Sequence, residues 1–415
     1  MKFFTFFYTL LIVLALAGCS DTAQTPPGTP PTTPPAVPPA PVKPPVTEGE
    51  CTYEIRSDIT VATTWVNTPA ACDYEVGVIS VTNGQLTIEP GTVVRFRQDG
   101  YLNVDVAGSL YAVGTPSERI TFEGGEAVKG FGKGLYFSDG SLESRVEYAD
   151  LRYLGKLDEG YYKFQNGAIS GYLGGGLTLK NTTVMGSNYF GAELNGGSLV
   201  LSEFANNRFY DNADAGVFVS PENVSKLDAA SDYVGEDAPN GLPYILVGRS
   251  YETAVYGTIL WPNTGAPYGI QNLPTFRGDH VIAPGAEFVF DEDGFIRFNG
   301  GTLTAVGTPQ QPIIFRGLEA TPGWWADIEI VNASAQLQHV EVRHGGYDGL
   351  YADRSITAER NASLQIDNSV IADGLGYGVV CVEESQVSVG AGMRFENLTD
   401  EPYGVDGSCS SFVTP

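Results

Sequence analysis

The chain has 415 residues, of which 42% are hydrophobic and 11% aromatic, enough for a large core in one or two domains. Its 51 glycines and 26 prolines, with only 17% charged residues, favour a β protein dense in turns over a helical one. The formal net charge of −26 at pH 7 argues against a nucleic-acid partner, because such a surface repels phosphate backbones.

Residues 1–18 have the features of an export signal: one lysine, then an apolar run too short to span a membrane as a helix. The run ends Leu-Ala-Gly-Cys at residues 16–19, which resembles a bacterial lipobox. That resemblance implies cleavage before Cys19, lipidation of its thiol and a membrane anchor; Ser20 after it indicates the outer membrane or cell surface. The alternative is an ordinary signal peptide with a chance cysteine.

Residues 19–50 form a tether that begins at the lipidated cysteine. Proline pairs recur from Pro26 to Pro45 without apolar periodicity, which is typical of a polyproline II spacer. At about 3.1 Å per residue such a spacer reaches roughly 60 Å. It would hold the body that follows away from the membrane, towards a partner.

Four further cysteines form two local pairs, one at each end of the body. In an exported chain they predict the disulfides Cys51–Cys72 and Cys381–Cys409. No C-x-x-C occurs and only three histidines exist, so the sequence predicts no metal site and no cofactor. The alternative is a Ca²⁺ site at residues 291–294 (DEDG), although the matching residues 97–100 (RQDG) share only the Asp-Gly of a turn.

The body contains a duplication. LTIEPGTVVRF at 86–96 returns as HVIAPGAEFVF at 280–290, an offset of 194 (280 − 86). The likeness extends to other segments, with an offset that drifts from 196 (261 − 65) to 187 (368 − 181), as small loop deletions would produce. The matched segments are Trp65 and Trp261, Tyr74 and Tyr268, VGTP at 113 and 306, ITFEG at 120 and IIFRG at 313, ADLRYLG at 149 and VEVRHGG at 340, LTLKNTTV at 177 and LQIDNSVI at 364, and NRFYDN at 207 and MRFEN at 393.

Each half consists of short runs with the period of two of a strand, separated by turn residues. Pro90-Gly91 fits a type II turn, and Asn181 and Asn368 each follow a strand in a place that suits a left-handed conformation. Short strands in tandem leave three folds: a propeller, a pair of sandwiches or a parallel β-helix. The absence of an inner period near 40–50 residues disfavours the propeller, and sparse hairpin signals disfavour the sandwiches.

In residues 55–405, TIEPGT, VGTP and ITFEG in that order, with a Trp and Tyr upstream, resemble the right-handed parallel β-helix proteins of the pectin-lyase-like superfamily, above all their bacterial cell-surface lipoproteins. The resemblance implies one continuous right-handed solenoid of about ten to twelve coils, with a first half at 51–247 and a second at 248–415. Ala283 and Ala286 depart from the motif, where Glu89 and Thr92 stand in the first copy, but Pro-Gly survives.

Members of this superfamily include polysaccharide lyases and hydrolases, so catalysis has to be weighed. The strand arginines Arg95, Arg152, Arg297 and Arg343 are candidate bases, but no Arg-x-Pro-x-x-Arg occurs, and exposed arginines paired with acids are the simpler interpretation. Fold alone grants no function, and no catalytic residue is assigned. We expect a surface-displayed binding or structural module for a glycan or envelope protein; the alternative is a polysaccharide lyase or glycoside hydrolase. Oligomeric state stays open.

Binding is predicted at the loops after the matched arginines, which are aromatic and acidic and leave the coil at the same point of each half. The alternative is that their tyrosines shield strand edges. The candidate binding residues are Tyr161, Tyr162, Tyr347, Tyr351, Asp158, Glu159, Asp348 and Asp353. Trp324-Trp325 is a weaker candidate for stacking on sugars, with core packing as its alternative.

Overall fold

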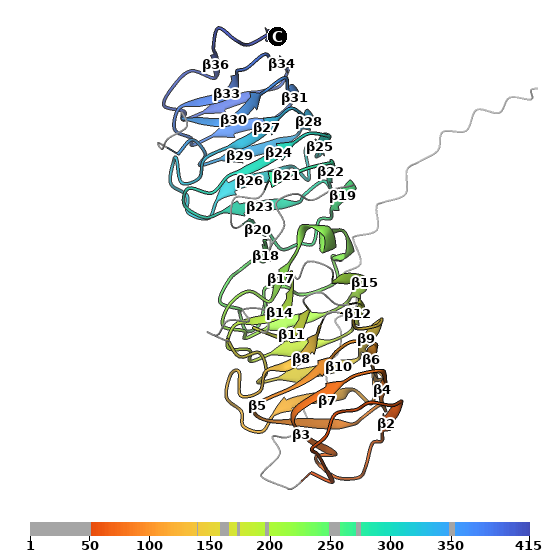
Figure 1. The fold of residues 1–415 in the computed structure, drawn as a ribbon. Coiled ribbons are helices and arrows are strands. Elements are labelled where there is room, and N and C mark those ends of the chain that lie inside the picture. The colour runs from red at the N-terminus through yellow and green to blue at the C-terminus, as the bar shows by residue number, and fades with distance from the viewer. Residues whose placement is uncertain are drawn as a thin grey trace, which may run out of the picture. The chain divides into compact units, whose positions relative to one another are not determined.

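The computed structural model describes residues 51–138, 140–157, 166–171, 175–195, 199–248, 258–270, 275–347 and 353–415. Glu48–Pro415 forms one compact unit. It is an all-β parallel solenoid of about 13 turns with about 2% helix, as the sequence predicts (Figure 1). The turn count exceeds the ten to twelve expected because several strands, such as β21 (Thr275–Phe276), are too short to show an alternating pattern.

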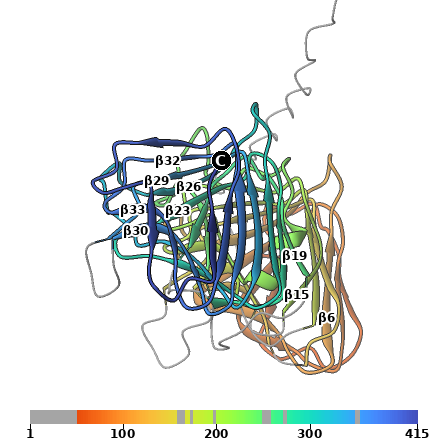
Figure 2. The ribbon, with the colours of Figure 1, turned by 90° about the horizontal axis from the view of Figure 1, so that it is seen from above.

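Strands of successive coils pair in parallel and form three columns, and Figure 2 shows from above how coils of the second half overlie one another. The first column contains β2 (Thr63–Trp65), β4 (Gly84–Ile88), β6 (Gly108–Val113), β9 (Ser144–Glu147), β12 (Gly176–Lys180) and β15 (Val200–Ala205), then β19 (Thr258–Trp261), β22 (Asp279–Ile282), β25 (Thr302–Val306), β28 (Ser334–Gln338), β31 (Ser363–Asp367), β34 (Gln386–Val389) and β37 (Ser411–Val413).

The second column contains β1 (Tyr53–Ile55), the starts of β3 (Tyr74–Val81) and β5 (Val93–Val104), β7 (Ile120–Gly124), β10 (Ala149–Arg152), β13 (Thr183–Met185) and β16 (Arg208–Tyr210), then β20 (Tyr268–Ile270), β23 (Glu287–Phe290), β26 (Ile313–Gly317), β29 (Val340–Arg343), β32 (Val370–Ala372) and β35 (Arg394–Glu396). The third contains the ends of β3 and β5, β8 (Gly134–Phe137), β11 (Gly167–Gly171), β14 (Phe190–Leu194) and β17 (Val217–Val219), then β21, β24 (Ile296–Asn299), β27 (Ile328–Val331), β30 (Arg354–Glu359), β33 (Tyr377–Cys381) and β36 (Tyr403–Val405).

Inward side chains of each coil lie on those of the next and form one continuous core. Leu86 pairs with Leu110, and Ile88 with Ala112, all at most 1% exposed. Because side chains alternate along a strand, each inward residue leaves its neighbours pointing outward. The stack therefore separates the residues that stabilise the fold from those available to a partner.

The duplication found in the sequence is also present in the structure. The amide of Glu89 donates to Trp65 O at 2.9 Å, and that of Ala283 donates to Trp261 O at 2.9 Å. Gly91 and Gly285 have φ of 82° and 80°, as a type II turn requires, and Asn181 and Asn368 are left-handed at 52° and 48°. The retained Pro-Gly therefore keeps the same corner in both halves despite Ala283 and Ala286.

The halves join through a change of column. β18 (Ile245–Val247) pairs with β17 of the third column on one side and with β20 of the second column on the other. In the first column, the 3-10 helix η1 (Pro221–Lys226) stands between β15 and β19.

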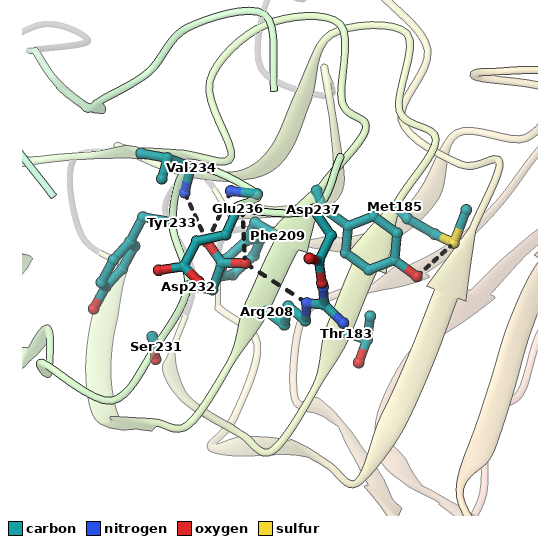
Figure 3. Close-up of polar contacts among 12 residues, drawn as sticks. Thr183, Met185, Arg208, Phe209, Ser231, Asp232, Tyr233, Val234, Glu236 and Asp237 are labelled. Atoms are coloured by element: carbon teal, nitrogen blue, oxygen red, sulfur yellow. Dashed lines mark hydrogen bonds and ion pairs between the residues drawn. The ribbon is translucent and has the colours of Figure 1, made fainter. Parts of the chain in front are cut away.

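The second column of the first half ends beyond β16 in a turn capped by a carboxylate. Asp232 accepts the backbone N–H groups of Val234, Gly235 and Glu236 at 3.1, 2.8 and 3.4 Å, and lies 3.6 Å from the guanidinium of Arg208 (Figure 3). These bonds satisfy backbone donors that the next coil would otherwise pair.

Each terminal coil is joined to its neighbour by a cysteine pair at disulfide distance, as predicted. Cys51 meets Cys72 with a Cα–Cα distance of 4.6 Å, and Cys381 meets Cys409 at 5.5 Å. An end coil has only one neighbour to pack on, so the cross-link restrains the coils most prone to fray.

Adding a methyl group to the glycine of the shared corner should reduce stability more than adding one to a glycine with free space around it. A Cβ on Gly285 would lie 2.4 Å from Nδ2 of Asn263, whereas one on Gly300, which has the same φ of 80°, meets nothing within 4 Å. We expect Gly300→Ala to cost about 1 kcal/mol through left-handed strain, and Gly285→Ala to cost more because Asn263 must also move. Thermal unfolding of both variants measures the difference, and equal losses would contradict the proposed crowding.

Candidate functional site

The two loops predicted to bind a partner leave the stack at one kind of corner, between the second and third columns: one joins β10 to β11, the other β29 to β30. Tyr347 is 36% exposed, and its amide donates to Trp325 O at 3.1 Å. Asp353 is half-buried, and its carbonyl accepts the amide of Tyr377 at 2.7 Å. The other six candidates, Asp158, Glu159, Tyr161, Tyr162, Asp348 and Tyr351, lie outside the described residues, so binding at these loops stays a prediction.

A buried carboxyl group lies on the outward side of the third column, on the coil below the second loop. Asp327 is 4% exposed, and its Oδ2 accepts the hydroxyl of Thr357 at 2.6 Å and lies 3.4 Å from Nε of Arg354. Burial, and next the nearby charge of Glu329, raise the pKa of Asp327 to about 7, while Thr357 and Arg354 act in the opposite direction. Burial therefore favours the protonated, uncharged form of Asp327.

Two further carboxylates surround Asp327. Glu329 lies two residues along β27 and is ion-paired with Arg297 on β24, the strand below. Glu359 lies on β30, the strand above, and burial and then the charge of Glu329 raise its pKa. We name this group the carboxylate–arginine cluster: Arg297, Asp327, Glu329, Arg354 and Glu359.

The cluster brings together a carboxyl group whose pKa is raised by burial, Asp327, and a carboxylate paired with a cation, Glu329. One acid and one base near each other are what glycosidic bond hydrolysis needs. The side chains of Asp327 and Glu329 are only 6% and 9% exposed, however, so most of their surface faces neighbouring coils. The arrangement can transfer a proton to a substrate only if the substrate reaches these residues. Otherwise it is a packed network of ion pairs that stabilises the coils.

The first half has its own buried acid in the third column. Glu193 on β14 is 2% exposed, and its Oε2 accepts the amide of Asn166, the residue just before β11, at 2.9 Å. Burial raises the pKa of Glu193 to about 7, opposed by the hydrogen bonds from Asn166. In the first half Asn166, just before β11, contacts the buried acid Glu193. In the second half Arg354, the first residue of β30, contacts the buried acid Asp327. Each contact is made where the chain returns from its loop to the third column.

Sequence reasoning missed both buried acids because outward Asp and Glu are ordinary in a strand. ADIEI at 326–330 reads simply as an exposed edge with alternating polar residues. The offset of 193 between ITFEG and IIFRG (313 − 120), carried on to the next strand, matches Asp327 to Gly134 and Glu329 to Tyr136. Comparison of these two positions is the one signal that could have found the cluster.

The four candidate arginines are each ion-paired, as the simpler interpretation of the sequence held. The pairs are Arg95–Glu123 at 3.1 Å, Arg152–Asp150 at 3.4 Å, Arg297–Glu329, and Arg343 with Glu341 at 3.0 Å and Asp373 at 3.2 Å. Their side chains lie across the outer faces and cancel the charge of acids on the same or adjacent strands.

The tryptophans and one histidine belong to packing. Trp325 is fully buried and stacks on Phe290 at 4.1 Å, and the indole N–H of Trp324 donates to Phe290 O at 3.1 Å. His280 lies in the core, where it accepts the indole N–H of Trp261 at 3.3 Å, and burial lowers its pKa to about 4. Core packing, the alternative for the Trp pair, is therefore the correct interpretation for Trp325.

His339 and His344 do not lie within one strand. They flank β29 in left-handed conformations, with φ of 49° and 64°, where the first half has Tyr148 at 47° and Tyr153 at 58°. They are corner residues of the coil.

In the ranges that the structure describes, no group of three or more His, Cys, Asp or Glu side chains is arranged to hold a metal ion. No helix among the described residues is both long and apolar enough to span a membrane. A comparison with models of protein families found no match, and neither did comparisons with curated protein sequences and with solved structures.

The buried acid of the first half predicts a pH-dependent stability. The pKa of Glu193 is higher in the folded chain than in the unfolded one, so the unfolded state loses this proton first as pH rises. Its contribution therefore falls from about pH 4.5 to about pH 7. We expect Glu193→Gln, which keeps an acceptor for Asn166, to gain stability relative to the parent over this range, on the order of 3 kcal/mol.

Thermal unfolding at pH 4, 6 and 8 measures this effect. Glu222→Gln, at an exposed position of η1, is the matched control and should leave the pH profile of the parent unchanged. A constant difference between Glu193→Gln and the parent at all three pH values would contradict the raised pKa.

Proposed function

We propose that the protein is a lipid-anchored module displayed at the cell surface, which binds a glycan or another envelope component. The observation that carries the proposal is the parallel register of the first column in the second half, which continues without a shift from β22 to β34. Outward side chains recur in line over several coils, as in β25, β28, β31 and β34, where residues pair one to one. A rigid face that repeats in this way suits a long or repetitive partner.

The N-terminal segment, which lies outside the described residues, supports the same proposal from the sequence. Cys19 follows a lipobox-like signal and precedes a proline-rich tether. Several acyl chains on Cys19 would anchor the chain stably, and the stiff tether would hold the solenoid clear of the lipid.

The anchor is tested by labelling growing cells with an alkyne fatty acid. The parent chain should take up the label and enter the detergent phase, and Cys19→Ala should lose the label, because the thiol that is acylated is gone. Ser20→Ala, the adjacent change, should keep it. Labelling of Cys19→Ala at the level of the parent would disprove the lipid anchor.

The binding function is tested by incubating the purified protein with isolated envelopes. Saturable binding that the unlabelled protein competes away supports a module. Absence of any saturable binding to envelopes or to their extracted glycans would disprove it.

A second function, hydrolysis or lyase cleavage of a polysaccharide, is favoured by one observation, the carboxylate–arginine cluster. Burial raises the pKa of Asp327, which favours its protonated form, and Glu329 lies two residues further along the chain, on β27. We expect an enzyme of this kind to lose at least about a hundredfold in rate on Asp327→Asn or Glu329→Gln.

Reducing-end release and absorbance of unsaturated products from a panel of polysaccharides measure that rate. Glu341→Gln, which removes an ion-paired acid in the second column, is the control that should keep it. Cleavage that persists in both variants would show that the cluster is not its source.

A further inference from the structure

One lateral face of the second half lacks the ion pairs that cover the other surfaces described above. It is the outward side of the first column on β25, β28, β31, β34 and β37, which pair in this order; the first four lie one above another in Figure 1. We name it the hydroxyl–amide face, and its residues are Thr302, Thr304, Ser334, Gln336, Ser363, Gln365, Gln386, Ser388 and Ser411. None of these nine residues is charged, although the chain carries 49 acidic and 23 basic residues. The one charged side chain on the outward side of these five strands is Asp367, the last residue of β31, which accepts the side-chain amide of Gln338 at 2.9 Å.

The face is open to solvent. All of its residues are exposed except Thr304, which is half-buried. Within the described residues, only Thr302 shows a side-chain hydrogen bond to the protein, to Asp279 at 2.7 Å. The remaining hydroxyl and amide groups are donors and acceptors that water now satisfies.

The face is also regular. β28 pairs with β25, and β31 with β28, residue for residue and without a bulge, as Ser334 with Ser363 and Gln336 with Gln365. Parallel strands lie about 4.8 Å apart, and alternate residues along a strand are about 6.6 Å apart. The side chains therefore form a flat two-dimensional lattice of hydrogen-bonding groups.

The first half provides an internal comparison, because the same column there is charged. With LTLK at 177–180 matched to LQID at 364–367, the pairings put Arg145 in the place of Gln336, and Lys180 in that of Asp367, which is also charged. Lys180 bridges Glu147 at 3.8 Å and Glu203 at 2.6 Å, and Arg145 pairs with Glu147. Stacking alone thus does not require an uncharged surface at this column.

We propose that the hydroxyl–amide face binds an ordered surface of neutral polysaccharide chains. This inference rests on the proposed binding function and specifies its ligand class. The nine residues offer no positive charge to an acidic polysaccharide, and a net charge of −26 repels such a ligand. Hydroxyl and amide groups both donate and accept, as sugar hydroxyls do, and can replace the water bound to each surface.

The lattice favours an extended ligand over a single sugar. Each Ser or Gln contact exchanges one water-bound hydrogen bond for another and so contributes little by itself. Many such contacts on one rigid face act together, because the first contact places the others in register. The backbone behind them is already ordered, so little further entropy is lost on binding.

The test is a binding assay with insoluble polymers, using the full-length protein solubilised in mild detergent. The probes are cellulose, chitin and β-1,3-glucan as neutral polymers, and alginate beads as the acidic one. The test variant is Gln365→Glu combined with Gln386→Glu, which places two charges on the face. The matched control is Val78→Glu combined with Val200→Glu, at positions 60% and 56% exposed on other parts of the stack.

We expect the parent to bind at least one neutral polymer and not alginate, the test variant to bind at least about tenfold more weakly, and the control to bind as the parent does. Three results would overturn the inference: no binding to any neutral polymer, equal binding by the test variant, or an equal loss in the control. Saturable envelope binding alongside any of these would leave the proposed module standing and refute only this assignment of its ligand and face.

Discussion

Parallel pairing of one coil with the next is the constraint on which the rest of the structure depends. It requires that like positions fall above one another, so an inward apolar residue always meets another. Phe288 stacks on Phe315 at 4.8 Å, and Phe290 on Trp325 at 4.1 Å, as a direct result of this register. A slip of one residue would turn a whole strand inside out, so the buried faces fix the register firmly.

The same constraint leaves the outward positions free to change, and the two halves use that freedom differently. Core positions agree, as with Ile88 and Ile282 or Phe96 and Phe290, all at most 2% exposed. Outer positions diverge: Gly134 becomes Asp327, and Arg145 becomes Gln336. The second half therefore has a cluster of acids in its third column, and in its first column a face on which Asp367 is the one charged residue. Core positions also change, as from Val94 to Phe288, but both side chains are apolar and fully buried, so the scaffold is retained.

The fold could be predicted from the sequence because its signals are local. Pro90-Gly91 needs a glycine with positive φ, Asn181 needs a left-handed turn, and the alternating runs indicate strands; each was confirmed. The surfaces could not be predicted in the same way, because their character depends on which coils become neighbours. Asp327 is buried only because Thr357 and Arg354 arrive 27 or more residues later in the chain (354 − 327), and Gln336 joins Gln365 only through the register.

Stacking also creates a hazard at its two ends, since a last coil presents unpaired strand edges to any other chain. The described end coils reduce that hazard in three ways. Their strands, such as β1 and β37, are only three residues long. Exposed charges surround them, with Arg97 paired to Glu54 and Glu75 at one end, and Asp400 and Glu401 at the other. Because both ends are cross-linked and charged, the lateral columns are the long and regular surfaces that the described part of the solenoid presents to solvent.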